Sequence, residues 1–214
     1  MDKLRKAALP ITFIAATILP FIFISSEVVE HHPIGPDTFL LTLLHNHATH
    51  FLAIFFKAVT STGGLKGIIV IAALLGAFLL YKKRRREVYF LVTAIVSASL
   101  LNYVLKLLFE RNRPDLWPSL ITEYYYSYPS GHAMASSAVT FAVIYIAWKT
   151  RFRWPVVIIA SIYAFFVGLS RIYLGVHYPS DVVAGWIVSF FLVTLLSSLF
   201  LNFPFKFRKK KLET

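Results

Sequence analysis

Long blocks of apolar residues separated by short polar segments make up most of this chain. A helix that crosses the hydrocarbon core of a membrane needs about 20 largely apolar residues, with a working range of about 17–25. Six stretches have this length: Ala7–Ser26, Leu65–Tyr81, Val88–Leu108, Ala133–Lys149, Trp154–Tyr173 and Val182–Asn202. The pattern predicts an all-α, polytopic membrane protein with six transmembrane helices, which form a single domain over residues 1–214.

Residues 38–61 have a mixed pattern that does not fit a seventh span. Thr38, His45 and Lys57 belong to a polar stripe with a period close to that of a helix, and Leu44 and Phe55 belong to an apolar surface. Such a helix lies in the membrane interface with its apolar face toward lipid. We therefore expect one amphipathic helix, or two short ones, at the outer interface between the first two spans.

Composition supports the membrane assignment. The chain is 57% hydrophobic and 15% charged, whereas a soluble domain carries about 25% charged residues. The mean hydropathy is +0.68. The chain has no cysteine, which excludes disulfides, cysteine metal sites and a thiol nucleophile.

The distribution of positive charge predicts the orientation. Of the 22 Lys and Arg residues, 16 lie in four clusters, in segments 3–6, 82–86, 149–153 and 206–211. Cytoplasmic loops carry such an excess of basic residues, so both termini are expected in the cytoplasm. A net charge of +12 also suits a nucleic-acid binder, but clusters at the ends of apolar blocks favour a role in topology. We expect no nucleic-acid partner.

A first polar cluster ends the third expected span. Lys106 and Arg113 stand seven residues apart, about two helical turns, so a continuing helix places both on one side. Pro114 disfavours the α conformation at Arg113 and is expected to end the helix there. The two cations can bind a phosphate, Arg as a planar fork and Lys as a point charge. A single cation at this place is more typical of an interfacial anchor.

A second cluster, Pro129-Ser130-Gly131-His132, precedes the fourth span. Gly131 lets the backbone approach a ligand closely, and the amides that open a helix form an anion site. His132 can supply a proton to a leaving oxygen. Taken alone, the cluster is more typical of a turn with a helix N-cap.

A third cluster, Ser170-Arg171 followed by His177 and Asp181, connects the last two spans. Pro179 suits the first turn of the final helix, with His177 just before that helix and Asp181 inside its first turn. The carboxylate can then hydrogen-bond one imidazole nitrogen and leave the other nitrogen ready to attack. The alternative is a polar N-cap with an uninvolved histidine.

All three clusters are expected on the outer side of the membrane. Charged groups near a membrane are costly, so their convergence indicates function. A metal centre is one alternative, but three basic residues repel a divalent cation and only Asp181 supplies a well-placed carboxylate. The spacing of His45, His47 and His50 matches no familiar zinc motif. We expect a phosphate site with no metal and no cofactor.

The three motifs together resemble the signature of the type-2 phosphatidic acid phosphatases. These are the lipid phosphate phosphatases, which share a site with vanadium haloperoxidases and bacterial acid phosphatases. The motifs read Lys106-x6-Arg113-Pro114, Pro129-Ser-Gly-His132 and Ser170-Arg171-x5-His177-x3-Asp181, and every motif residue is present. The chain is most similar to small bacterial members that act on phosphatidylglycerol phosphate or undecaprenyl diphosphate.

The resemblance implies a role for each motif residue. His177 would be the nucleophile that forms a phosphohistidine, and Asp181 would orient it. His132 would protonate the leaving oxygen and then activate water. The phosphoryl oxygens would be bound by Lys106, Arg113, Ser130, Gly131 and Arg171.

The expected substrate is a lipid phosphate or diphosphate that enters from the bilayer, and no obligatory protein partner is expected. Phosphatidylglycerol phosphate and an isoprenoid diphosphate are the leading candidates, followed by phosphatidic acid. A phosphotransferase, in which an alcohol replaces water, remains an alternative. A phospholipid transporter or scramblase would need the cations but not a His–Asp pair with a second histidine. The outer-loop residues Tyr124–Tyr126 predict an interfacial aromatic belt, with a substrate-binding lid as the alternative.

Overall fold

The computed structural model describes residues 2–30 and 35–201, and it describes residues 2–13 by their backbone only. This part of the chain contains eight α-helices joined by turns and loops, and no strand occurs in it. The helices are α1 (Asp2–Val29), α2 (Gly35–Asn46), α3 (His50–Gly63), α4 (Leu65–Tyr81), α5 (Arg85–Phe109), α6 (Gly131–Ala147), α7 (Arg153–Tyr173) and α8 (Pro179–Leu201).

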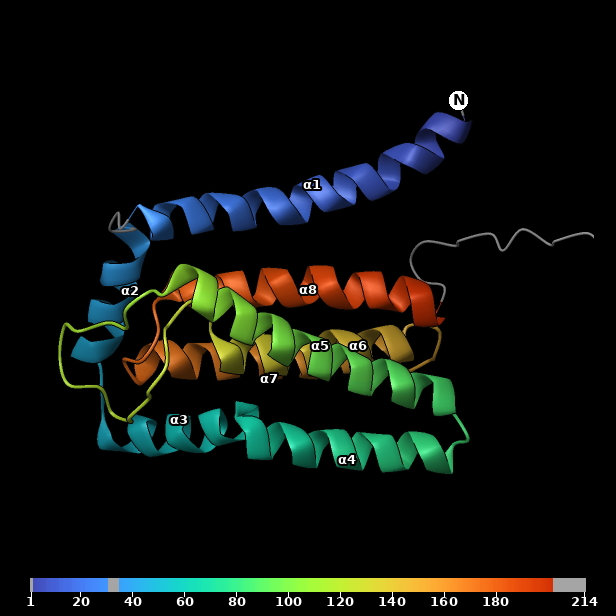
Figure 1. Ribbon diagram of the computed structural model, residues 1–214. Helices are drawn as coiled ribbons and strands as arrows, with labels where there is room; N and C mark the ends of the chain where they lie inside the picture. The colour runs from blue at the N-terminus through green and yellow to red at the C-terminus, as the bar shows by residue number, and fades with distance from the viewer. Residues whose placement is uncertain (1, 31–34, 202–214) are drawn as a thin grey trace, which may run out of the picture.

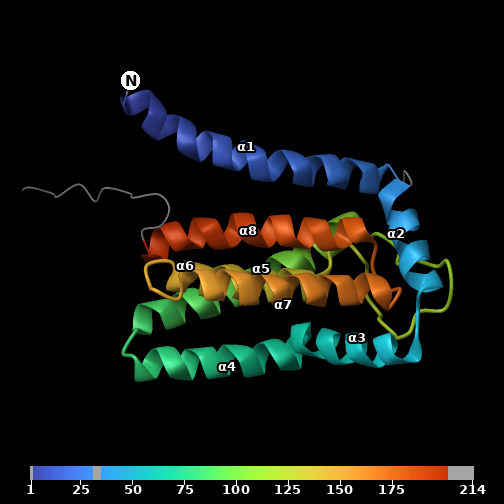
Figure 2. The same ribbon diagram turned by 180° about the vertical axis from the view of Figure 1, so that it is seen from behind.

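The long helices run side by side as a bundle, and α2 lies across one end of it (Figures 1 and 2). Helix α6 packs against α5, α7 and α8 and forms the centre of the bundle. Its sequence explains this place, since Ala133, Ser137, Ala138 and Ala142 are all buried. Small side chains let helices approach closely without a hydrophobic driving force from water.

Helices α3 and α4 form one bent unit. They meet at Gly64 with a bend of 59°, and together they are long and apolar enough to cross a membrane. Thr49 caps α3 by accepting a hydrogen bond from the amide of Leu52 at 3.2 Å. The expected amphipathic segment is therefore divided between two helices with different positions. Helix α2 lies across the bundle end, whereas α3 lies along α7 (Figure 1).

The packing of α3 on α7 gives the physical reason for this difference. Phe56 is buried against Tyr173, with ring centroids 4.5 Å apart. A Cβ on Gly63 would come within 2.4 Å of Val167. The polar stripe also has a partner inside the bundle, because Thr60 accepts a hydrogen bond from Arg171 at 2.6 Å.

The number of spans is only partly tested by these helices. Helices α5, α7 and α8 are each long and apolar enough to cross a membrane, and the bent α3–α4 pair makes a fourth candidate. Helix α6 is apolar but shorter, and so is Ile14–Val29, the part of α1 whose side chains are described. The protein is thus a helical membrane protein, and the total of six spans stays a prediction. The end of the last expected span, Asn202, lies outside the described residues.

The two ends of the bundle differ in chemistry. The α4–α5 and α6–α7 connections, which carry the basic segments 82–86 and 149–153, lie at the end opposite α2 (Figures 1 and 2). The segment between α5 and α6, which contains Arg113, lies at the α2 end (Figure 1). The basic segment 206–211 lies outside the described residues.

The close approach of α7 to α8 predicts the effect of one substitution. A Cβ on Gly168 would lie 2.4 Å from the ring of Trp186 and 2.7 Å from Val182. Overpacking of this kind costs about 1–3 kcal/mol, so Gly168→Ala should lower the thermal unfolding temperature in detergent. Gly76→Ala is the matched control, because a Cβ there meets nothing within 4 Å. It should leave stability unchanged or raise it, since Ala is the better helix former. Equal unfolding temperatures for the two variants would contradict the close α7–α8 packing.

Candidate active site

A buried His–Asp pair lies at the α2 end of the bundle. His177 is in the turn before α8, and Asp181 is in the first turn of that helix. Their side chains are almost fully buried, and His177 Nδ1 lies 3.2 Å from Asp181 Oδ2. The same carboxylate oxygen accepts the backbone N–H of Tyr178 at 2.9 Å. Asp181 is therefore held by its own helix start and in turn orients the imidazole.

The second imidazole nitrogen of His177 faces a cation. Arg113 Nη1 lies 3.2 Å from His177 Nε2 and donates to the carbonyl of Val176 at 2.7 Å. Burial and the positive charges of Arg171 and Arg113 hold the pKa of His177 well below its ordinary value of 6.5. The imidazole is thus neutral at pH 7. With Nδ1–H directed at Asp181, Nε2 carries the lone pair.

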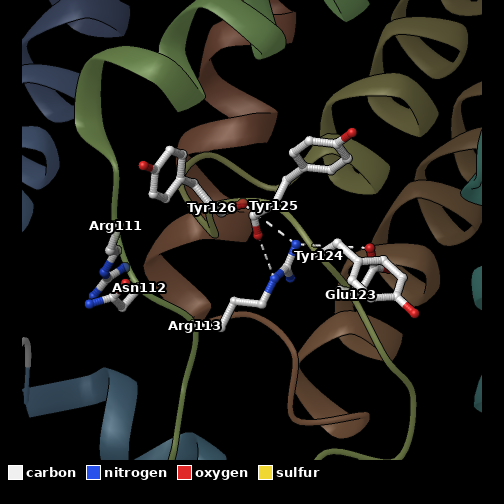
Figure 3. A pocket seen from close by; sticks show the side chains of 7 residues that line it. All are labelled: Arg111, Asn112, Arg113, Glu123, Tyr124, Tyr125 and Tyr126. Atoms are coloured by element: carbon white, nitrogen blue, oxygen red, sulfur yellow. Dashed lines mark hydrogen bonds and ion pairs between the residues drawn. The ribbon is translucent and has the colours of Figure 1, made fainter.

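The three cations of the motifs come from three places. Lys106 is in the last turn of α5, Arg113 is in the segment after it, and Arg171 is in the last turn of α7. Lys106 donates to the backbone carbonyl of Tyr126, and Arg113 donates to that of Tyr125 at 2.7 Å. Figure 3 shows the guanidinium of Arg113 directed toward these tyrosine carbonyls.

A backbone hydrogen bond links the second motif to the third. The amide of Ser130 donates to the backbone carbonyl of Asp181 at 3.0 Å, and α6 begins at the next residue, Gly131. A Cβ at Gly131 would come within 2.9 Å of Asn102 Oδ1, which explains why glycine is needed there. Within the described residues, the buried Ser130 Oγ and Arg171 Nε have no hydrogen-bond partner. Two polar atoms without partners suit a site for an oxygen-rich ligand.

Two cavities meet at His132. One cavity, of about 420 Å³, is lined by Lys106, Arg113, Gly131, His132 and His177 together with Glu123 and residues of α5. The other, of about 520 Å³, is mostly apolar and lies between α4, α5 and α6. Both are lined by Asn102, Gly131 and His132. A chamber that holds both histidines and three charged side chains therefore adjoins an apolar one between the helices.

The structure brings all the motif residues to one end of the bundle. Of the eight predicted site residues, five line the cavity that holds both histidines, and the other three are linked to it indirectly. Asp181 reaches it through His177, Arg171 through an ion pair with Glu123, and Ser130 through the backbone of Asp181.

Glu123 is a site residue that the motifs did not indicate. Its carboxylate pairs with Arg171 and lies 3.9 Å from Arg113. Burial favours the neutral acid, but the charge of Arg171 and its hydrogen bond hold the pKa of Glu123 below its ordinary value. The sequence offers one signal for this residue: Glu123 is an acid in the loop that connects two motifs rich in expected phosphate-binding groups.

The remaining candidate features are the histidines of segment 45–50 and the tyrosines of segment 124–126. Among residues 2–30 and 35–201, no group of three or more His, Asp and Glu side chains could hold a metal ion. His47 Nδ1 lies 2.8 Å from the carbonyl of Leu43, and His45 stacks on Trp117 with ring centroids 4.0 Å apart. Tyr124 and Tyr125 are largely exposed.

Helices that can cross a membrane, with a histidine-containing cationic cavity at one end, define the class of this protein: a membrane phosphatase that acts on lipid substrates. The family model described as the PAP2 superfamily matches residues 87–204. This range is more than half of the chain and includes all three motifs. The chain belongs to the PAP2 superfamily.

Curated relatives agree with this assignment. The chain is 34% identical to phosphatidylglycerophosphatase B of Bacillus subtilis over 143 residues, which are 63% of this chain and 70% of that protein. It is 37% identical to an undecaprenyl-diphosphatase of Sulfolobus acidocaldarius over 115 residues, 51% of this chain and 53% of that protein. The match thus spans only about half the length of the Sulfolobus protein.

Solved structures share the fold. The transmembrane PAP2-type phosphatidylglycerolphosphate phosphatase from Bacillus subtilis superposes with a TM-score of 0.79 at 25% identity, covering 88% of this chain and 96% of that one. LpxE of Aquifex aeolicus superposes with a TM-score of 0.63 at 25% identity, covering 75% and 93%.

Proposed function

We propose that the chain hydrolyses phosphatidylglycerol phosphate, undecaprenyl diphosphate or both, through a phosphohistidine on His177, at the extracytoplasmic membrane surface. The observation that carries the proposal is the buried His177–Asp181 pair, whose Nε2 faces a cavity that also contains His132 and Arg113. The names of the relatives support these substrate classes. The adjoining apolar cavity supports a substrate that keeps its hydrocarbon chain in the bilayer.

In the first step, Nε2 of His177 attacks phosphorus while the bond from phosphorus to the leaving oxygen breaks. Burial and the charge of Arg171 lower the pKa of His132 to about 3 in the protein alone, so His132 takes up the proton that it donates only when the negative phosphate group is bound. It passes this proton to the leaving oxygen, and the product leaves as a neutral alcohol or as the shorter phosphate. Asp181 stabilises the positive charge that develops on the imidazole of His177. This division of labour follows the logic of an activated nucleophile oriented by a third group.

The cations act on the phosphoryl group itself. Lys106, Arg113 and Arg171 bind the equatorial oxygens, where charge is spread in the transition state. Ser130 Oγ and the Gly131 amide supply further donors, and Ser130 Oγ has no other partner in the described part of the chain. Preorganised donors of this kind supply a large share of catalysis in a water-poor site.

In the second step, water attacks the phosphohistidine. His132, now neutral, accepts a proton from the water, and the bond from phosphorus to Nε2 breaks. Inorganic phosphate leaves, and both histidines return to their starting states.

The first prediction is that hydrolysis needs no divalent metal, because three protein cations neutralise the phosphoryl oxygens. Purified protein in detergent should release inorganic phosphate from short- and long-chain lipid phosphates and diphosphates in excess EDTA. Loss of activity that one added metal restores would contradict this expectation. Transfer of phosphate to an added alcohol without net phosphate release would identify a phosphotransferase. No phosphate release or transfer with any lipid would favour a transporter.

A second prediction separates the two histidines. His177→Ala should abolish turnover of every substrate. His132→Ala should still form phosphoenzyme from an aryl phosphate, because a good leaving group departs without the proton that contributes about 10²–10⁴-fold for a poor one. Since water activation is also lost, acid-labile and base-stable phosphate should accumulate on His132→Ala after a brief pulse. Phosphate found on His132 in the His177→Ala protein would reverse the two roles.

A third prediction concerns the side of the membrane. The chain has no cysteine, so single cysteines report their own position. Ser119 is exposed in the segment between α5 and α6, and Lys82 is exposed at the basic end of the bundle. On intact cells, an impermeant thiol reagent should label Ser119→Cys and spare Lys82→Cys until the cells are opened. The reverse pattern would place the chemistry in the cytoplasm.

A further inference from the structure

Arg111 is a cation at the site that does not belong to the phosphate-binding group. It stands two residues before Arg113 in the chain, but the two side chains diverge. Both arginines line an open cavity of about 490 Å³, but Figure 3 shows only Arg113 directed toward the tyrosine carbonyls and Glu123. Arg111 does not line the cavity that holds His132 and His177.

The terminal nitrogens of Arg111 are bound to protein. Nη1 donates to Asp181 Oδ1 at 2.5 Å and to Ser180 Oγ at 2.7 Å. The guanidinium carbon also lies 4.0 Å from the ring centroid of Tyr178, a cation–π contact. Arg111 thus reaches the carboxylate oxygen that His177 does not use.

The other nitrogen of Arg111 reaches helix α2. Nη2 donates to Asp37 Oδ2 at 2.9 Å. Asp37 is itself buried and also accepts the amide of Ser180 at 2.8 Å and its hydroxyl at 2.5 Å. Asp37 therefore holds both Arg111 and the first turn of α8, which carries Asp181.

We propose that Arg111 and Asp37 are positioning residues of the active site: Arg111 keeps the carboxylate of Asp181 ionised and oriented toward His177, and Asp37 keeps Arg111 in place. This inference rests on the proposed role of His177 as the nucleophile. It gives α2, which lies outside the residues matched by the family model, a part in positioning the nucleophile.

The physical reason is the cost of an isolated buried charge. Asp181 is fully buried, and a buried carboxylate without a partner takes up a proton instead. A protonated Asp181 would lose the charge that stabilises the imidazolium of His177. Two carboxylates beside Arg111 balance its own burial and raise the pKa of its guanidinium above the ordinary value. Burial raises the pKa of Asp181 above its ordinary value, and the charge and hydrogen bond of Arg111 oppose that rise. Loss of Arg111 would therefore favour the neutral acid at Asp181.

The test separates positioning from substrate binding. Arg111→Gln should lower kcat by about 10²-fold, the usual cost of a misplaced catalytic group. Its KM, and the inhibition constant of inorganic phosphate, should change by less than about threefold, because the lost interaction acts on the transition state. Arg113→Gln, which removes a phosphate-binding cation, should instead raise both constants. A rise of both constants in Arg111→Gln would make Arg111 a substrate ligand and overturn the proposal.

Asp37 is tested with two substitutions and a double variant. Asp37→Asn retains an oxygen for the Ser180 amide but removes the charge, so it should lower kcat while the protein stays folded. Combined with Arg111→Gln, it should add no further loss of kcat, because the two residues act as one unit. Independent, additive losses would overturn the linked arrangement. Asp37→Glu should restore part of kcat, which a purely structural contact would not predict.

Arg84→Gln is the matched control, since Arg84 pairs with Glu87 at 3.0 Å at the opposite end of the bundle. It should leave kcat and KM unchanged. Thermal unfolding of every variant in detergent separates folding from catalysis. If Arg111→Gln is stable and has a normal kcat while His177→Ala is inactive, the positioning role is contradicted and the proposed function is not. An active His177→Ala protein would contradict the proposed function instead.

Discussion

The arrangement of the polar end depends on the carboxylate of Asp181, a negative charge fully buried inside a membrane protein. Such a charge is stable only with close opposite charge and several hydrogen bonds. Its partners come from separate parts of the chain: the Tyr178 amide and His177 from the turn before α8, and Arg111 from the segment after α5. Its backbone carbonyl also accepts the Ser130 amide. Asp181 thus brings together the ends of three helices: its carboxylate joins the end of α5 to the start of α8, and its main-chain carbonyl joins the start of α6.

The same requirement explains why the site needs a dense mixture of charges. The cations of the site repel one another, so groups with negative or partial negative charge must lie beside them. Backbone carbonyls of Tyr125 and Tyr126 and the carboxylate of Glu123 supply this charge. The negative groups of the site therefore fall into two sets: one contacts His177, and the other lies beside Lys106, Arg113 and Arg171.

Much of the helical scaffold could be predicted from local sequence. The span expected at Leu65–Tyr81 is helix α4 as observed, and α7 begins one residue earlier than expected. The polar residues of α3 predict a helix at the membrane interface with these residues facing solvent. Thr60 instead bonds Arg171, a partner 111 residues away. No local pattern contains such a pairing.

The candidate site shows the same division. His132, His177 and Asp181 could be predicted as site residues because they belong to motifs with a fixed spacing. Asp37 and Ser180 are 143 residues apart, and a lone acid near the start of a short helix gives no signal of its own. Glu123 likewise belongs to no repeating pattern. Long-range ion pairs are therefore the part of this site that only the folded chain reveals.

The tyrosine-rich segment holds Lys106 and Arg113 through main-chain oxygens, which has a consequence for how this enzyme class diversifies. Every residue type carries a backbone carbonyl, so exchange of the Tyr125 and Tyr126 side chains leaves these two acceptors in place. The exposed side chains of Tyr124 and Tyr125 can then vary while the charge balance beneath them is retained. The identity of these side chains and the binding of the two cations are separable here, because the cations are bound by the peptide backbone.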